Sequence, residues 1–141
     1  MSNVDQVKAK VQAILTEKAP VSIDSDGDYT IPVGSTRVWV RVLPHPNTEA
    51  TLIHIAAPVL SGVPLTPDLY EYVALNTDKL IFGHLALNVE DNGGFLLVSY
   101  MLLGDFLDGD ELLYGVFGVA GAADGLDDDL QKRFGGKRFA D

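Results

Sequence analysis

The residues from Leu80 to Leu103 constrain the fold of this chain more than any other stretch. Two apolar runs, LIFGHLALNV and FLLVSYMLL, are joined by the polar segment EDNGG, which contains Asn92 and Gly93. Asn-Gly between apolar runs is the strongest local signal for a β-hairpin, because both residues tolerate the positive φ of a primed turn. We therefore expect two adjacent antiparallel strands here.

The two arms of this hairpin differ in how their apolar residues are spaced. The first arm alternates apolar and other residues, which is typical of a strand with one buried face. The second arm is apolar on both faces. One face carries Phe95, Leu97, Met101 and Leu103, and the other carries Leu96, Val98, Tyr100 and Leu102. Both faces of the second strand therefore need cover.

Two helices and three strands are expected before the hairpin. Apolar residues three and four positions apart predict a helix over residues 4–18. Alternation predicts strands over residues 29–33, 36–43 and 51–56, with Val38, Val40 and Val42 on the core face. Thr66 followed by Pro67 is a typical helix start, so we expect a short helix over residues 66–76.

A long helix is expected after the hairpin, starting near Asp108. One of its stripes is apolar and faces the sheet: Leu112, Val116, Val119, Ala123, Leu126 and Leu130. A neighbouring flank is nearly smooth and contains Gly115, Gly118, Gly121, Ala122 and Gly125. Each glycine within a helix costs about 1 kcal/mol relative to alanine. Close packing within the chain, contact with a second copy or a peptide, and a helix break near residues 121–125 all remain open explanations.

These elements predict an α+β fold. We expect an antiparallel sheet of about five strands in the order α-βββ-α-ββ-α, with the first and last helices packed on one face. A chain of 141 residues that is 47% hydrophobic is long enough for one domain, which we place at residues 1–134. Residues 135–141 form a basic and aromatic tail, and we leave open whether it is disordered or docks on the acidic body.

The only tryptophan of the chain lies between two arginines on the face of its strand opposite Val38. Arg37, Trp39 and Arg41 can hold a partner by stacking and by pairing with carboxylates. Alternatively, the arginine stems cover the indole and the guanidinium groups pair with the protein's own acids. We favour the second interpretation.

Composition excludes several classes of function. The net charge of −10 disfavours binding to nucleic acid, because an acidic surface repels phosphates. The amino end lacks the features of a signal peptide, no apolar run is long enough to cross a membrane, and cysteine is absent, so we expect a soluble cytoplasmic protein without membrane contact.

Residues that carry catalytic or metal chemistry show no recognisable pattern. The three histidines lack ligand spacing, and no phosphate-binding or dinucleotide motif occurs. The acidic run from Asp24 to Asp28 departs from a calcium loop, because Tyr29 and Ser35 stand where such a loop needs glycine and glutamate. Turn chemistry accounts for this run. We therefore expect no enzyme activity, no metal and no cofactor.

The chain resembles the type III secretion chaperone-like superfamily, and more closely its YbjN-type branch, which includes peptide-binding chaperone-like domains of actinobacteria. The resemblance rests on Asn76, on Phe82-Gly83 at the start of a strand, on the polar turn at residues 90–94, on the strand at residues 95–103 and on the acidic helix start near Asp108. It implies a noncatalytic protein, often dimeric, that holds a segment of a partner polypeptide.

Three hypotheses for function follow. The first is a homodimeric module that binds a peptide or protein client, with Leu96, Val98, Tyr100 and Leu102 as the first candidates for an uncovered surface, and burial within the chain as the alternative. The second is a small-molecule sensor or enzyme with a pocket between helix and sheet near His84 and Tyr100. The third is a structural subunit of a larger assembly.

Overall fold

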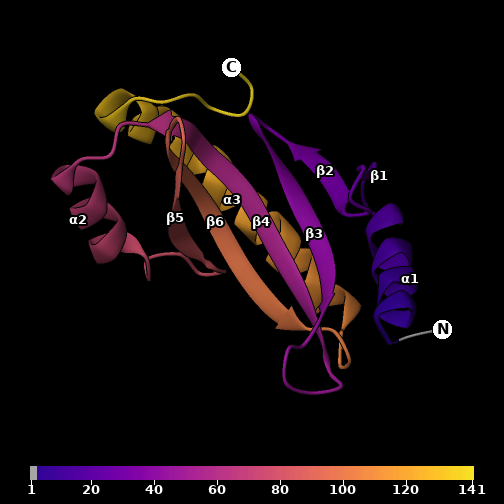
Figure 1. Ribbon diagram of the computed structural model, residues 1–141. Coiled ribbons are helices and arrows are strands. Elements are labelled where there is room, and N and C mark those ends of the chain that lie inside the picture. The colour runs from indigo at the N-terminus through magenta and orange to yellow at the C-terminus, as the bar shows by residue number, and fades with distance from the viewer. Residues whose placement is uncertain (1–2) are drawn as a thin grey trace.

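The protein is built on one antiparallel sheet with its helices on one side and at one edge (Figure 1). The structure, a computed structural model, describes residues 3–141. Along this part of the chain the elements are α1 (Asn3–Thr16), β1 (Ser22–Ile23), β2 (Tyr29–Val33), β3 (Thr36–Pro44), β4 (Thr51–Val63), α2 (Pro67–Asn76), β5 (His84–Glu90), β6 (Gly93–Leu103) and α3 (Gly109–Phe134). The predicted α+β class and the order of the helices are confirmed. The sheet has six strands where about five were expected, and the additional strand is the two-residue β1.

The sheet order is β1-β2-β3-β4-β6-β5, and every neighbouring pair is antiparallel. The predicted hairpin is confirmed as β5 and β6, which pair from His84 with Ser99 to Glu90 with Gly93. Its turn differs from the expected primed type, because Gly93 has a φ of 122° while Asn92 does not have a positive φ. Only glycine adopts this conformation readily. Gly93 alone therefore has the positive φ that we expected at both Asn92 and Gly93.

One face of the sheet, here called the inner face, packs against α1 and α3. Val38, Val40 and Val42 lie on it and are buried, as predicted. The apolar stripe of α3 is buried against the same face at Leu112, Val116, Val119, Ala123 and Leu130. The buried side of α1 consists of Val7, Val11 and Leu15. The expected placement of the first and last helices on one face is therefore confirmed, and the core lies between them and the sheet.

The orientation of β6 corrects the prediction of an uncovered surface. Leu96, Val98 and Leu102 are 0%, 0% and 7% exposed and lie on the inner face beneath α3, where the partly buried Tyr100 also packs. The side of β6 that no helix of the described residues covers carries Phe95, Leu97, Met101 and Leu103, of which Leu97 is only 8% exposed. The sequence left both orientations possible because both faces are apolar. The position of α3 decides between them, since α3 packs on Ile55, which pairs with Tyr100 across β4 and β6.

The other face of the sheet, here called the outer face, carries no helix among the described residues. We expected α2 to be the remaining cover for that face. Instead it lies beyond the edge strand β5 (Figure 1), where Tyr72 packs against Phe134 at the end of α3 with 5.4 Å between ring centroids. Its predicted start is confirmed, because Thr66 is the N-cap and accepts a hydrogen bond from the backbone of Leu69. Among residues 3–141, no helix therefore covers the outer face.

The last helix is continuous from Gly109 to Phe134, so the break considered near residues 121–125 is wrong. Asp108 caps it by accepting hydrogen bonds from the backbone N–H groups of Asp110 and Glu111. After Phe134 the chain turns back along the end of the sheet (Figure 1). The backbone N–H and C=O of Lys137 bond to those of Ser61 at 2.8 Å each. The tail is thus docked on the body.

Candidate functional site

An apolar trough lies on the outer face of the sheet. It has a volume of about 320 Å³. Its lining consists of six apolar residues from three adjacent strands and the tail: Trp39, Ala56, Pro58, Phe95, Leu97 and Phe139. Strand pairing explains this grouping, because Trp39 pairs with Ala56 and Pro58 pairs with Leu97. The trough exists because alternate residues of β3, β4 and β6 point away from the helices.

The trough continues into a smaller polar cavity of about 160 Å³ toward the start of β4. The two cavities share Trp39 and Ala56, and the second adds Asp28, Arg41 and His54. The site is therefore apolar at one end and charged at the other. Such a surface can hold an apolar side chain and orient the chain that carries it through a few polar contacts.

The predicted row of Arg37, Trp39 and Arg41 lies on the outer face, and the protein's own polar groups engage all three side chains. Arg41 binds Asp28 through Nη2 at 2.6 Å and Nε at 2.9 Å. The indole Nε1 of Trp39 donates to Oδ2 of Asp24 at 3.1 Å. Arg37 donates to Oγ1 of Thr30 at 2.8 Å. Intramolecular pairing, the favoured interpretation, fits these contacts, and it fixes the indole as a wall of the trough.

Charges at the polar end are set by these contacts. The hydrogen bond and the charge of Asp28 raise the pKa of Arg41 above its usual value. Burial lowers the pKa of His54, and the nearby Arg41 lowers it further, so His54 is neutral at neutral pH. Nε2 of His54 lies 2.8 Å from Oγ of Ser99. The polar end therefore presents one half-exposed guanidinium group and a neutral imidazole.

The acidic turn before β2 brings Asp24, Asp26 and Asp28 together, with ligand oxygens within 4.8 Å of one another. Their main contacts are with the protein itself. Oδ1 of Asp24 accepts hydrogen bonds from the backbone N–H groups of Asp26 and Asp28, both at 2.9 Å. These bonds, the Asp28 one first, lower the pKa of Asp24. The turn chemistry expected from the sequence is confirmed, and the cluster positions Trp39 and Arg41.

The pocket considered near His84 and Tyr100 does not form, because the two residues lie on opposite faces. His84 pairs with Ser99 on the outer side, whereas the ring of Tyr100 packs against α3 on the inner side. Adjacent residues of a strand point to opposite faces, so Ser99 and Tyr100 cannot share a pocket. The two residues that the sensor or enzyme hypothesis placed in one pocket therefore do not share one.

The smooth flank of α3 is only partly used within the chain. A Cβ at Gly115 would lie 3.3 Å from both Ile55 and Tyr100, and a Cβ at Gly118 would lie 2.6 Å from the ring of Phe82. No atom of residues 3–141 lies within 4 Å of the corresponding points at Gly121 and Gly125, while Ala122 is partly buried against the core. Packing within the chain therefore explains Gly115 and Gly118, and the remaining glycines leave an open strip.

Beside this strip lies a second surface with exposed aromatic residues. A groove of about 350 Å³ is lined by Phe82, Asp110, Leu113, Tyr114, Phe117 and Gly118. Tyr114 is 69% exposed and Phe117 is 38% exposed. We call this groove and the open strip at Gly121 and Gly125 the α3 surface. It lies on the outward side of α3, away from the trough.

Sequence reasoning identified Trp39 but missed the other five lining residues of the trough. Pro58 and Leu97 become neighbours only through the pairing of β4 with β6, which hydropathy patterns do not specify. Phe139 arrives from the other end of the chain. The sequence marked Phe139 as part of a basic and aromatic tail that could dock on the body, but it did not indicate where the tail docks.

One of two comparisons with known proteins identifies a family for this chain. Residues 3–141 match the family model TY-Chap1, described as T3SS (YopN, CesT) and YbjN peptide-binding chaperone 1. A comparison with curated protein sequences gives no match. Within residues 3–141 no helix is both long enough and apolar enough to span a bilayer. Since the family model matches every described residue, including the tail, the chain belongs to the TY-Chap1 family.

Proposed function

We propose that this protein is a noncatalytic chaperone-like module that holds an extended segment of a client protein in the trough of the outer face. The observation that carries the proposal is the trough itself, with five apolar lining residues on the strands and Phe139 of the tail beside them, on a sheet face that no helix of residues 3–141 covers. The family description, a peptide-binding chaperone, supports the same role. The earlier candidates Leu96, Val98 and Leu102 support the trough from beneath, because they pack the inner face of β6.

The size and chemistry of the trough favour a peptide segment over a folded surface. Full burial of one large apolar side chain contributes about 1.5–3 kcal/mol, so one or two anchors give a weak, reversible complex. Beyond the trough, the outer face also exposes Met101 and Leu103, at 49% and 54%. An extended client can place alternate side chains along this row, since residues two apart in an extended chain share a face. The net charge of −10 disfavours nucleic acid as the occupant.

Selection from a phage-displayed library of random dodecapeptides tests this function. We expect the Ala56→Glu variant to lose at least tenfold in affinity for peptides selected on the wild-type chain, because the glutamate places a charge in the apolar trough. The control is Ala13→Glu on the exposed side of α1, which should bind like the wild type. Equal binding by both variants would refute the trough as the client site.

We further propose a homodimer through the α3 surface. The exposed rings of Tyr114 and Phe117 supply apolar area, and the open positions at Gly121 and Gly125 allow the close approach of a second helix. Light scattering should give twice the 15.2 kDa mass of one chain. We expect Phe117→Glu to return the mass to that of one chain, while Phe106→Glu, at an exposed position in the loop before α3, keeps it doubled. A wild-type chain that stays monomeric at 100 µM would contradict the dimer.

A further inference from the structure

The tail (residues 135–141) follows an unusual course from the helical side of the sheet to its outer face. Gly135 and Gly136 have φ values of 83° and 86°, which favour glycine and allow a sharp turn after α3. A Cβ at Gly136 would lie 2.7 Å from the carbonyl oxygen of Ser61, so only glycine fits this approach. The turn brings Lys137 to β4 and places Phe139 at the trough.

The tail pairs with a strand edge that β3 leaves open. The pairing of β3 with β4 begins at the pair Pro44–Thr51 and ends at the pair Trp39–Ala56. Among the described residues, β3 does not pair with β4 beyond Ala56. Beyond that point Ser61 of β4 exchanges two backbone hydrogen bonds with Lys137, each 2.8 Å long. Main-chain pairing at a sheet edge is one of the ways in which proteins bind extended peptides. The tail therefore makes the backbone contacts that a bound segment would make.

Phe139 makes the side-chain contact that a bound segment would make. Its ring meets Trp39 edge to face with 5.7 Å between centroids, and it forms one wall of the trough. The side chain nevertheless remains 49% exposed. Phe139 is therefore seated at the site without being enclosed by it, which leaves it easy to displace.

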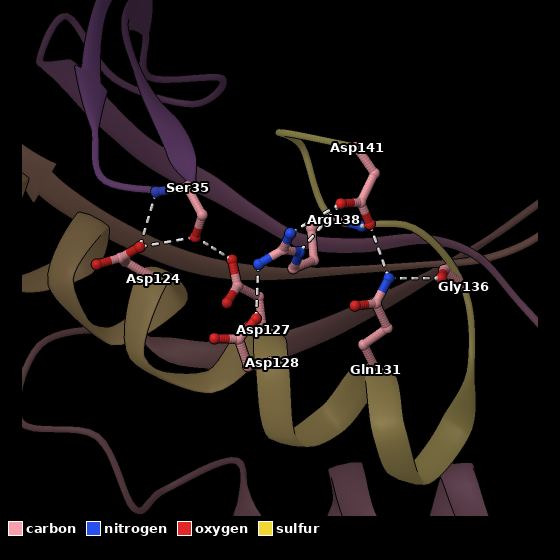
Figure 2. Close-up of polar contacts among 8 residues, drawn as sticks. All are labelled: Ser35, Asp124, Asp127, Asp128, Gln131, Gly136, Arg138 and Asp141. Atoms are coloured by element: carbon pink, nitrogen blue, oxygen red, sulfur yellow. Dashed lines mark hydrogen bonds and ion pairs between the residues drawn. The ribbon is translucent and has the colours of Figure 1, made fainter.

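Polar contacts on α3 hold the rest of the tail (Figure 2). Arg138 donates to Oδ1 of Asp128 at 2.6 Å and to Oδ1 of Asp141 at 2.9 Å. Nε2 of Gln131 donates to the carbonyl of Gly136 at 3.1 Å and to Oδ2 of Asp141 at 2.7 Å. Hydrogen bonds from Arg138 lower the pKa of Asp141 to about 2, so this carboxylate stays ionised at physiological pH. Most of these groups lie at the surface, where ion pairs contribute little and are screened by salt.

We propose that the tail is a built-in substitute for the client, and that client segments which displace it carry the same pair of residues, a basic residue followed directly by an aromatic one. This inference rests on the proposed function and specifies the partner of the same site. The aromatic residue fills the place of Phe139 against Trp39, and the basic residue replaces Arg138 beside Asp128. A protein with a net charge of −10 favours such a basic segment electrostatically.

Tethering determines how strongly the tail competes. A ligand joined by two glycines to the end of α3 acts at an effective concentration of about millimolar or more. A free peptide that takes the place of Phe139 against Trp39 then binds with its intrinsic Kd divided by the fraction of chains whose tail is undocked. Removing the Phe139 ring raises this fraction and should strengthen the binding of an added peptide about tenfold.

The test measures fluorescence anisotropy of a labelled peptide copying residues 135–141, GGKRFAD, with the 141-residue chain. We expect the Phe139→Ala variant to bind this peptide about tenfold more tightly than the wild type and than Phe106→Ala, which removes an exposed phenylalanine elsewhere. The peptide GGKRAAD should not bind, and GGQQFAD should bind at least fivefold more weakly. Adding Ala56→Glu to Phe139→Ala should abolish binding.

Two outcomes would overturn the inference. Equal affinity of the wild type and Phe139→Ala for GGKRFAD would show that the tail does not compete with the peptide. If GGKRFAD does not bind to Phe139→Ala, the sequence of the tail does not resemble that of the client segment. In either case, dodecapeptides that bind the wild type and lose affinity with Ala56→Glu would keep the proposed function intact. If no dodecapeptide depends on Ala56, the proposed function fails as well.

Discussion

Replacing Leu96 by alanine should lower the free energy of unfolding by about 2–5 kcal/mol, whereas Leu103→Ala on the same strand should lower it by less than about 1 kcal/mol. The two leucines differ in the face that they occupy. Leu96 is fully buried on the inner face, and Leu103 is 54% exposed on the outer face. Alanine at position 96 removes buried apolar atoms and leaves a cavity beneath α3, while alanine at position 103 mainly changes hydrated surface.

Urea unfolding followed by circular dichroism measures this difference. Both variants should unfold with the slope of the wild type, so that the midpoint alone reports stability. Equal losses of stability in the two variants, or a larger loss for Leu103→Ala, would mean that β6 is turned the other way. In that case the trough would not exist as described.

Two glycines of α3 should respond in opposite directions to alanine. At Gly118 the new Cβ would lie 2.6 Å from Cδ2 of Phe82 and 3.3 Å from its Cβ, so the whole ring must move. Overpacking of this kind typically costs about 1–3 kcal/mol, which exceeds the gain of about 1 kcal/mol in helix propensity. At Gly121 nothing lies within 4 Å, and Gly121→Ala should raise the free energy of unfolding by about 1 kcal/mol.

Thermal unfolding at a protein concentration at which light scattering gives the mass of one chain measures the pair of variants without a contribution from association. The double variant Gly118→Ala with Phe82→Ala serves as the control, because the clash then has no partner and the cost of the added Cβ should disappear. Stabilisation by Gly118→Ala alone would contradict the close packing between α3 and the segment before β5.

Most of the fold follows from local patterns. Alternation located β2, β3 and the start of β4, Thr66 and Asp108 marked two helix starts, and the Asn-Gly turn marked the hairpin. These features are encoded within a few residues, so physical rules for caps, turns and alternation read them directly. The side of β6 that faces α3 is not encoded in this way, because Leu96 and Leu97 are equally apolar.

The site was harder to predict because it is assembled from distant parts of the chain. Alternation placed Trp39 on the face away from the core, and this prediction is confirmed. The trough needs two further facts, namely that β4 lies between β3 and β6 and that Phe139 returns to the sheet after α3. Both depend on long-range pairing, as does the bridge between Ser61 and Lys137, which lies beyond the last pair of β3 with β4 at Ala56.

The most direct test of the trough as a client site uses the indole N–H of Trp39, the only tryptophan of the chain. In a proton–nitrogen correlation spectrum of the labelled protein, this group gives one indole peak. A dodecapeptide selected on the wild-type chain should shift the peak in a saturable manner, with a Kd equal to the one measured by calorimetry. Binding in calorimetry with an unmoved Trp39 peak would place the client elsewhere and contradict this account.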